Sequence, residues 1–184
     1  IMACIITKGR QLPCKSAFGG IKAAYFIDFN GTVGGVATGL GTITKTDGTV
    51  TAITGTPTVY KYDVKGASSL ETAITSSRDT GTTFYTQTLN LTFTYLDVET
   101  QQEIQLIAAS RPQVVVEDYY GNMFVCGIEN GCEMVSGTIG TGASAGDLSG
   151  FVITMEGIED EAAPWITPTL ITTATQGTQI DPTA

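Results

Sequence analysis

The sequence predicts a mainly β fold: an antiparallel β-sandwich or split barrel with one flanking α-helix and a long projecting β-hairpin. The 184 residues include 31 Thr and 22 Gly, a composition that favours strands and turns over helices. Alternating apolar and polar side chains mark strands along most of the chain, and helical spacing with a start signal occurs once. Many strands, one helix and then more strands are typical of a β domain with a packed helix.

The first predicted strand covers residues 21–29. Alternate positions place a set of apolar side chains on one face: Ile21, Ala23, Tyr25, Ile27 and Phe29. Asn30-Gly31 and Asp47-Gly48 are turn signals, and short Thr- and Val-rich runs between glycines predict short strands and loops over 32–58. A further strand is predicted over 59–64.

Residues 67–77 and 82–96 predict two long strands joined by a reversal at Asp79-Thr80-Gly81. In the second strand, Gln87 is in phase with the apolar face, and Thr and Asn occupy the opposite face. Its 15 residues exceed the usual strand length of about 5–6. We expect the hairpin tip to project beyond the domain, where its unpaired edges need another chain to cover them.

The helix is predicted to begin at Thr100. Thr100 and Glu103 have the spacing of a capping box, in which the two side chains bond free amides of the first turn. Ile104, Ile107 and Ala108 form the expected buried stripe, and a proline at position 112 ends the helix.

The remaining elements are predicted to be strands and loops. A strand begins at 114, residues 122–128 and 131–136 form a hairpin around 129–131, and 137–149 form a glycine-rich loop. The last strand spans 151–158, with Phe151, Ile153 and Met155 directed inward. We therefore expect one domain over 1–184, with an extended N-terminal arm (about 1–20) and an extended C-terminal tail (about 162–184).

The charge excludes some partners. Formal net charge is −9, and nine Lys and Arg are too few for a protein that binds DNA phosphates or an anionic membrane surface. Residues 1–96 carry a net charge of +3, whereas 97–184 carry −12. This asymmetry suits either a solvated acidic face or a self-complementary surface for head-to-tail assembly.

The chain has no His, which excludes Ser–His–acid triads, Cys–His pairs and His-ligated zinc. The four cysteines, Cys4, Cys14, Cys126 and Cys132, lack the spacing of a metal site. Basic residues interrupt the first 20 residues, so no secretory signal is predicted and we expect cytoplasmic synthesis with reduced thiols. A disulfide across the predicted turn, between Cys126 and Cys132, is the alternative.

Two other motifs favour structural roles. The spacing of the glycines over 140–146 does not fit a dinucleotide-binding loop, and a flexible loop is the better interpretation. The carboxylates at 156 and 159–161 lack calcium-loop spacing and predict a solvated face. We therefore expect no catalytic, cofactor-binding or metal-binding residues, an acid-pair enzyme using Glu156 or Asp118 being a weaker hypothesis.

The second half carries a resemblance to a known family. A strand at 114–118 runs into Tyr120-Gly121-Asn122-Met123-Phe124-Val125-Cys126-Gly127, and Glu129-Asn130-Gly131 follows. Then come Gly146-Asp147-Leu148-Ser149-Gly150-Phe151 and a closing strand to Gly157. With the preceding helix and hairpin, the element order over roughly residues 20–160 resembles the tail tube (major tail) proteins of long-tailed bacteriophages.

The resemblance implies a structural virion protein of the phage tail, assembled in the host bacterial cytoplasm, without enzymatic activity or cofactors. Subunits of that family form homo-hexameric rings whose inner strands close into one β-barrel. The rings stack head-to-tail and meet other tail proteins, and DNA passes through an acidic lumen during genome ejection without specific binding. Candidate lumen-lining residues are the carboxylates on or beside predicted strands: Glu117, Asp118, Glu129, Glu133 and Glu156. Strand alternation sends Glu117 and Asp118 to opposite faces.

Two alternatives remain open. One is the inner tube of a contractile injection system, which shares the fold. The other is a monomeric carbohydrate- or receptor-binding β-sandwich, which needs a concave aromatic platform, although the chain has a single Trp.

Overall fold

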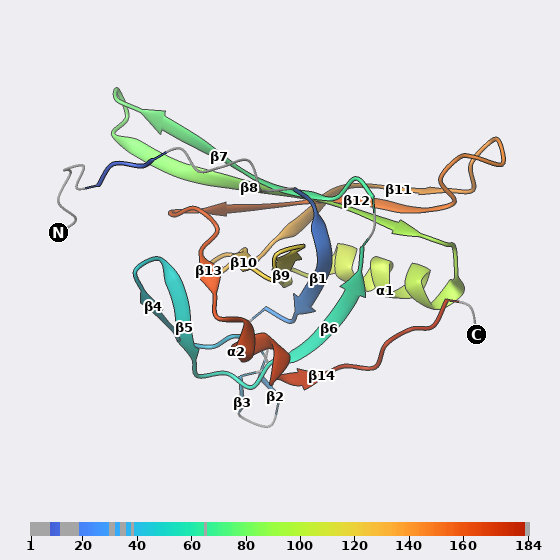
Figure 1. The fold of residues 1–184 in the computed structure, drawn as a ribbon, viewed down its shortest axis with the longest axis horizontal. Coiled ribbons are helices and arrows are strands. Elements are labelled where there is room, and N and C mark those ends of the chain that lie inside the picture. Colours follow the sequence, from blue (N-terminus) through green and yellow to red (C-terminus); the bar gives the residue numbers. More distant parts are fainter. Residues whose placement is uncertain are drawn as a thin grey trace.

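The computed structural model describes residues 8–11, 19–29, 32–33, 36–37, 39–64 and 66–182, and these form two packed β-sheets with two helices (Figure 1). The mainly β class with a flanking helix is confirmed, and a β-sandwich agrees with the two sheets, although no closed barrel is found. The eight-stranded sheet has the order β14 (Thr175–Gln176), β6 (Thr58–Asp63), β1 (Ile21–Ile27), β9 (Gln113–Asp118), β10 (Met123–Cys126), β13 (Trp165–Ile166), β5 (Thr49–Ile53) and β4 (Ile43–Thr46). The four-stranded sheet has the order β11 (Glu133–Gly140), β12 (Gly150–Glu159), β8 (Thr82–Thr94) and β7 (Ser69–Ser77). The other elements are β2 (Thr32–Val33), β3 (Val36–Ala37), α1 (Val98–Ala109) and α2 (Pro168–Thr172).

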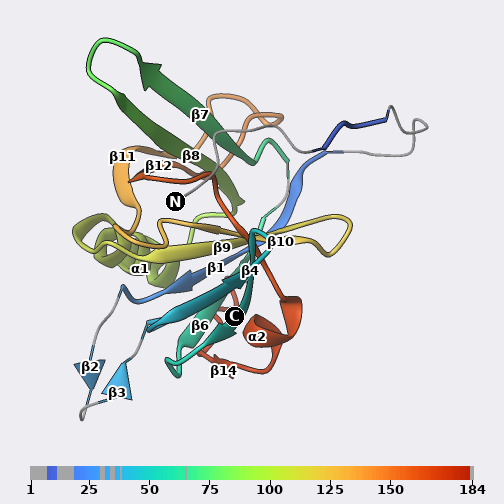
Figure 2. The same ribbon diagram turned by 90° about the vertical axis from the view of Figure 1, so that its left-hand side faces the viewer.

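The four-stranded sheet is antiparallel throughout, and it contains the predicted long hairpin. β7 pairs with β8 from Ser69 opposite Asn90 to Ser77 opposite Thr82, and the strands are joined by a turn at residues 78–81. The hairpin tip projects beyond the eight-stranded sheet in both views (Figures 1 and 2). β8 ends at Thr94 because Tyr95 has a φ of 77°, which a regular strand does not accommodate.

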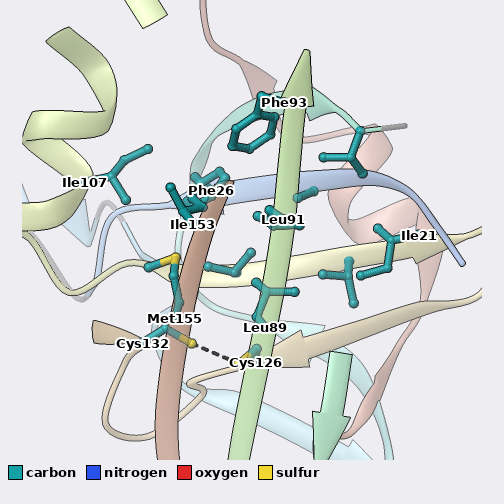
Figure 3. Close-up of a cluster of buried hydrophobic side chains, with 14 of the residues drawn as sticks. Ile21, Phe26, Leu89, Leu91, Phe93, Ile107, Cys126, Cys132, Ile153 and Met155 are labelled. Atoms are coloured by element: carbon teal, nitrogen blue, oxygen red, sulfur yellow. Dashed lines mark hydrogen bonds between the residues drawn. The ribbon is translucent and has the colours of Figure 1, made fainter. Parts of the chain in front are cut away.

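Two clusters of buried side chains form the hydrophobic core of the domain. The first lies between the two sheets and includes Leu89 and Leu91 from β8, Ile153 and Met155 from β12, and Phe26 from β1 (Figure 3). α1 lies beneath the four-stranded sheet and adds two isoleucines to this cluster (Figure 1). The second cluster is enclosed by the eight-stranded sheet and α2; its members include Ala23, Tyr25, Ile27, Val50, Val59, Val115, Val125, Ile166 and Ile171. β1 is thus buried on both faces.

The β1 face pattern differs from the prediction at its first residue. Ile21 was expected on the same face as Ala23, but it packs in the first cluster and Ala23 in the second. The pairing of β1 with β9 shifts register between these two residues, a bulge that moves Ile21 to the opposite face. The predicted turn at Asn30-Gly31 lies outside the described residues. The Asp47-Gly48 turn is confirmed, with a φ of 51° at Asp47 and 77° at Gly48.

The predicted capping box of the helix is wrong. The N-cap is Asp97, whose carboxylate accepts a hydrogen bond from the Thr100 backbone N at 2.8 Å, so α1 begins at Val98. Ile104 and Ile107 are buried as predicted, whereas Ala108 is exposed.

The predicted hairpin over 122–136 is also wrong, because its two strands belong to different sheets. β10 pairs with β9 and β13, whereas β11 pairs with β12. The connection, residues 127–132, carries the chain from one sheet to the other. β11 then extends to Gly140, which shortens the expected loop to 141–149.

The C-terminal segment packs on the domain where an extended tail was expected. β13 pairs in parallel with β5, and β14 pairs in parallel with β6, so this sheet is mixed rather than purely antiparallel. Ile166 and Ile171 are buried in the second cluster. The apolar positions of 165–171 are few and separated by Thr and Pro, so periodicity alone does not reveal these short elements.

Candidate assembly surface

The four-stranded sheet packs only one of its faces on the core. Gln87, Leu89 and Leu91 of β8 are buried, while the alternate residues Thr86 and Thr88 are partly exposed. We call the opposite side the outer face. It consists of side chains from all four strands: Ser69, Glu71, Ala73, Thr75, Phe84, Thr86, Thr88, Asn90, Thr92, Glu133, Ser136, Thr138, Val152, Thr154, Glu156 and Ile158. The outer face is therefore mainly hydroxyl-bearing, with a few carboxylates and apolar side chains.

Three carboxylates lie in one row across the outer face. Glu133 is paired with Glu156, Glu156 with Thr88, and Thr88 with Glu71. Directly opposed residues of antiparallel strands share a face, so all four side chains lie on the same side of the sheet. We call Glu71, Glu133 and Glu156 the carboxylate row.

No Lys or Arg occurs in any of the four strands of this sheet. The described cation nearest in sequence is Arg78, in the turn at the hairpin tip. Arg111, which follows α1, contacts the row from outside the sheet: its Nε lies 3.1 Å from Glu133 Oε1, with both side chains more than half exposed. The strands themselves thus give the outer face only negative charge.

Both edges of this sheet lack a partner strand in the described residues. β7 with nine residues is one edge and β11 with eight is the other. Ile74 on β7 is 66% exposed, and Val135 and Ile139 on β11 are about half exposed. Long edges that carry exposed apolar side chains are ready templates for pairing with another chain.

The structure places the five predicted lumen carboxylates in different settings. Glu133 and Glu156 lie together in the carboxylate row. Glu129 is exposed in the connection between the sheets. Asp118 organises the turn after β9, where its Oδ1 accepts hydrogen bonds from the backbone N of Tyr120 and of Asn122, each at 2.8 Å.

Glu117 is enclosed by its own chain, with a side chain only 11% exposed. Its carboxylate pairs with Lys22 Nζ at 2.9 Å and accepts a hydrogen bond from the Tyr25 hydroxyl at 2.7 Å. Burial raises the pKa of Glu117, but the bonds from Lys22 and Tyr25 outweigh burial, so the net shift is downward. This carboxylate contributes to the fold on the far side of the sandwich from the carboxylate row.

Sequence reasoning missed Glu71, although the hairpin contained the signal. In a hairpin whose turn is centred between residues 79 and 80, the numbers of each pair of opposed residues add up to 159. This register places Glu71 opposite Thr88. The predicted solvated face is wrong for Glu159, whose side chain points inward in β12 and is buried. Glu159 Oε1 accepts hydrogen bonds from the backbone N of Asn130 at 2.9 Å and of Glu129 at 3.2 Å. No local pattern indicates that a carboxylate caps a distant loop.

We expect Glu159→Ala to lower the free energy of unfolding by about 1–3 kcal/mol, because it leaves two loop amides without their acceptor. Glu159→Gln retains an acceptor oxygen and should cost less.

Burial, Glu129 and Asp160 raise the pKa of Glu159 above its ordinary 4.5. A raised carboxyl pKa means that ionisation costs stability as pH rises through the folded-state value. The free energy of unfolding of the Glu159→Gln variant, minus that of the wild type, should therefore rise from pH 4 to pH 7. Urea unfolding of both proteins at each pH measures this difference. A constant difference between the two proteins would contradict this assignment.

Two hollows lie elsewhere on the described surface. A pocket of about 430 Å³ lies beside the start of β1 and β7, with Phe124 as its one aromatic lining residue. A groove of about 890 Å³ runs between β6, the start of α1 and residues 176–182. Tyr62 in this groove packs edge-to-face against Phe26 and at a tilt against Phe93, and burial raises its pKa to about 12. The backbone of residue 177 lies against the ring of Tyr60. The groove has four aromatic lining residues, Tyr60, Tyr62, Phe93 and Tyr95, and of these Tyr60 and Tyr95 are 39% and 55% exposed.

Within the described part of the chain, no three metal-ligating side chains form a group able to hold a metal ion. None of the described helices has the length and apolar character to cross a membrane. No protein-family model, curated protein or solved structure matches the chain.

Proposed function

We propose that this protein is a tail tube subunit of a long-tailed bacteriophage, a structural virion protein that conducts DNA and has no catalytic role. Six copies form a ring, with the four-stranded sheet of each copy contributing to one β-barrel around the lumen. The outer face lines the lumen, and rings stack head-to-tail. The observation that carries this proposal is a sheet with one packed face, one polar unpacked face and two edges that have no partner strand among the described residues.

The edges support ring closure. β7 and β11 are the two edge strands of the same sheet, so β7 of one copy can add to β11 of the next. This contact is heterologous, and heterologous contacts that close generate rings. Closure would pair the unpaired backbone groups of both strands and remove the exposed edges.

The charge of the outer face supports a DNA conduit. The strands of this wall carry hydroxyls and carboxylates but no Lys or Arg, and Arg111 beside the row is ion-paired with Glu133, so the wall offers little positive charge to replace the counterions of a passing phosphate. If adjacent copies pair through β7 and β11, each subunit contributes its own carboxylate row to the wall of the lumen. The result would be a negative belt around the lumen that repels the DNA backbone and keeps it from binding to the wall.

The proposal is tested by the state of the purified protein. We expect concentrated protein to elute ahead of a 19.3 kDa monomer on size-exclusion chromatography and to form rings or hollow tubes in negative-stain images. A monomer that persists at high concentration would contradict the proposal and favour the binding-module alternative. Tubes surrounded by a separate sheath protein in the source virion would indicate a contractile system.

A further inference from the structure

Two cysteines meet where the chain crosses between the sheets. Cys126 is the last residue of β10, and Cys132 immediately precedes β11. Both side chains are fully buried, and their Sγ atoms lie 2.9 Å apart (Figure 3). The pair therefore joins the end of a strand in the eight-stranded sheet to the beginning of a strand in the four-stranded sheet.

The backbone of the connection brings the two thiols together. Gly127 and Gly131 have φ values of 69° and 78°, and the Gly131 N donates to the Gly127 O at 3.1 Å. A Cβ on Gly127 would lie 2.6 Å from the Cys132 N and 2.7 Å from its Sγ. Only glycine fits at this position, because any side chain there would displace Cys132.

Buried side chains from neighbouring strands hold the same connection. Gln87 Oε1 accepts a hydrogen bond from the Gly127 N at 3.0 Å, and Gln113 Nε2 donates to the Ile128 O at 2.8 Å. Glu159 accepts bonds from the next two amides, as described above. The Cys132 N donates to a backbone oxygen of residue 112 at 2.9 Å. The positions of the two cysteines are thus fixed from both sheets.

We propose that Cys126 and Cys132 form a reversible intramolecular disulfide that staples the crossing between the two sheets. The Sγ atoms need to approach by less than about 1 Å to reach the S–S bond length of about 2.05 Å. With glutathione disulfide as oxidant, one cysteine thiolate attacks a glutathione sulfur and releases one glutathione thiol. The second cysteine then attacks the mixed disulfide and releases the other. Two S–H bonds are lost, one S–S bond forms, and the two electrons and two protons end on two glutathione molecules.

The reduced pair is protected while the connection stays closed. The pKa of the Cys132 thiol is raised by its hydrogen bond to Cys126, by burial and by the nearby charge of Glu159. Since the thiolate is the nucleophile, oxidation requires the connection to open transiently or to close around an already formed bond. The proposal does not depend on tube assembly and holds for the isolated subunit.

Tryptic digestion separates this cysteine pair from the other two cysteines, because the second half of the chain contains few Lys and Arg residues. Trypsin cleaves after Arg78, and within 79–184 the remaining basic residue, Arg111, is followed by proline and resists cleavage. The fragment 79–184 therefore contains Cys126 and Cys132 but neither Cys4 nor Cys14. The purified full chain is incubated with glutathione disulfide, denatured in iodoacetamide without reductant, digested and weighed.

We expect the fragment to lose the mass of two hydrogen atoms and to carry no alkyl group, and dithiothreitol before alkylation should restore two alkylation sites. In a Cys126→Ser variant, the fragment should instead carry one glutathione adduct or one alkyl group. Two alkyl groups, two separate glutathione adducts, or a link to a Cys4 or Cys14 peptide in the wild-type protein would overturn the proposal.

A second measurement tests whether the native geometry accepts the bond. Closing so short a loop should raise the thermal unfolding midpoint of the oxidised chain by about 5 °C over the reduced chain. The comparison uses one wild-type preparation before and after dithiothreitol, so it does not require a cysteine variant to fold. An unchanged or lower midpoint after oxidation would contradict a disulfide that fits the native fold.

Discussion

A subunit with a shortened β7–β8 hairpin should fold but fail to form long tubes. Replacing residues 76–83 by Asn-Gly joins Thr75 to Phe84, which already face each other, through a two-residue turn suited to a hairpin. The removed residues are exposed or partly exposed, so the stability of the subunit should change by less than about 1 kcal/mol. The sedimentable fraction should fall strongly, because a loss of about 1.4 kcal/mol of contact free energy already lowers the association constant about tenfold.

The matched control keeps the hairpin length and removes only the charges at its tip. Arg78→Ala with Asp79→Ala should assemble nearly as well as wild type if the length of the ribbon provides the contact. Circular dichroism and urea unfolding verify that the shortened subunit is folded. Normal tubes from the folded, shortened protein would show that the hairpin tip plays no part in assembly.

Reversing the charge of the outer face should make assembled tubes retain DNA. Glu71→Lys with Glu156→Lys places two cations per subunit in the carboxylate row, where each can neutralise a phosphate and release its counterions. Tube formation should stay mostly intact, because these side chains remain hydrated in a wide lumen. We expect short duplex DNA to co-sediment with the variant tubes in a nuclease-protected form at low salt and to be released at high salt.

The control variant carries the same reversal on α1. Glu99→Lys with Glu103→Lys changes two exposed carboxylates away from the outer face, at a cost of a few tenths of a kcal/mol from the helix dipole. DNA bound to this variant should remain open to nuclease. Equal protection by both variants, or none by the first, would contradict a lumen lined by the outer face. In an infectious particle, the Glu71 and Glu156 reversal should also slow or block genome ejection.

The sequence was most informative where alternation was long and uninterrupted. The apolar positions of 82–94 and 151–155 predicted both the strands and their buried faces, since a period of two leaves little freedom over many residues. The helix stripe was correct at Ile104 and Ile107. Its N-cap was misassigned because Asp97 and Thr100 both precede the apolar stripe with suitable side chains, and the carboxylate forms the bond in the structure.

Other features depended on contacts that alternation does not encode. Strand pairs β13–β5 and β14–β6 contain two residues each, too few for a periodic signal. The connection 127–132 has turn residues that suit a hairpin, but Gln87, Gln113 and Glu159 from distant strands hold it as a crossing between sheets. The carboxylate row could be predicted only in part, because it depends on strand order as well as on local pattern.

A cryo-electron microscopy reconstruction of the assembled protein would show whether the four-stranded sheet lines the lumen of a ring of identical subunits. We predict a hollow tube in which β7 of each subunit is hydrogen-bonded to β11 of its neighbour, with Glu71, Glu133 and Glu156 facing the channel. A tube whose channel is lined by the eight-stranded sheet, or whose subunits meet without β7–β11 pairing, would contradict this account.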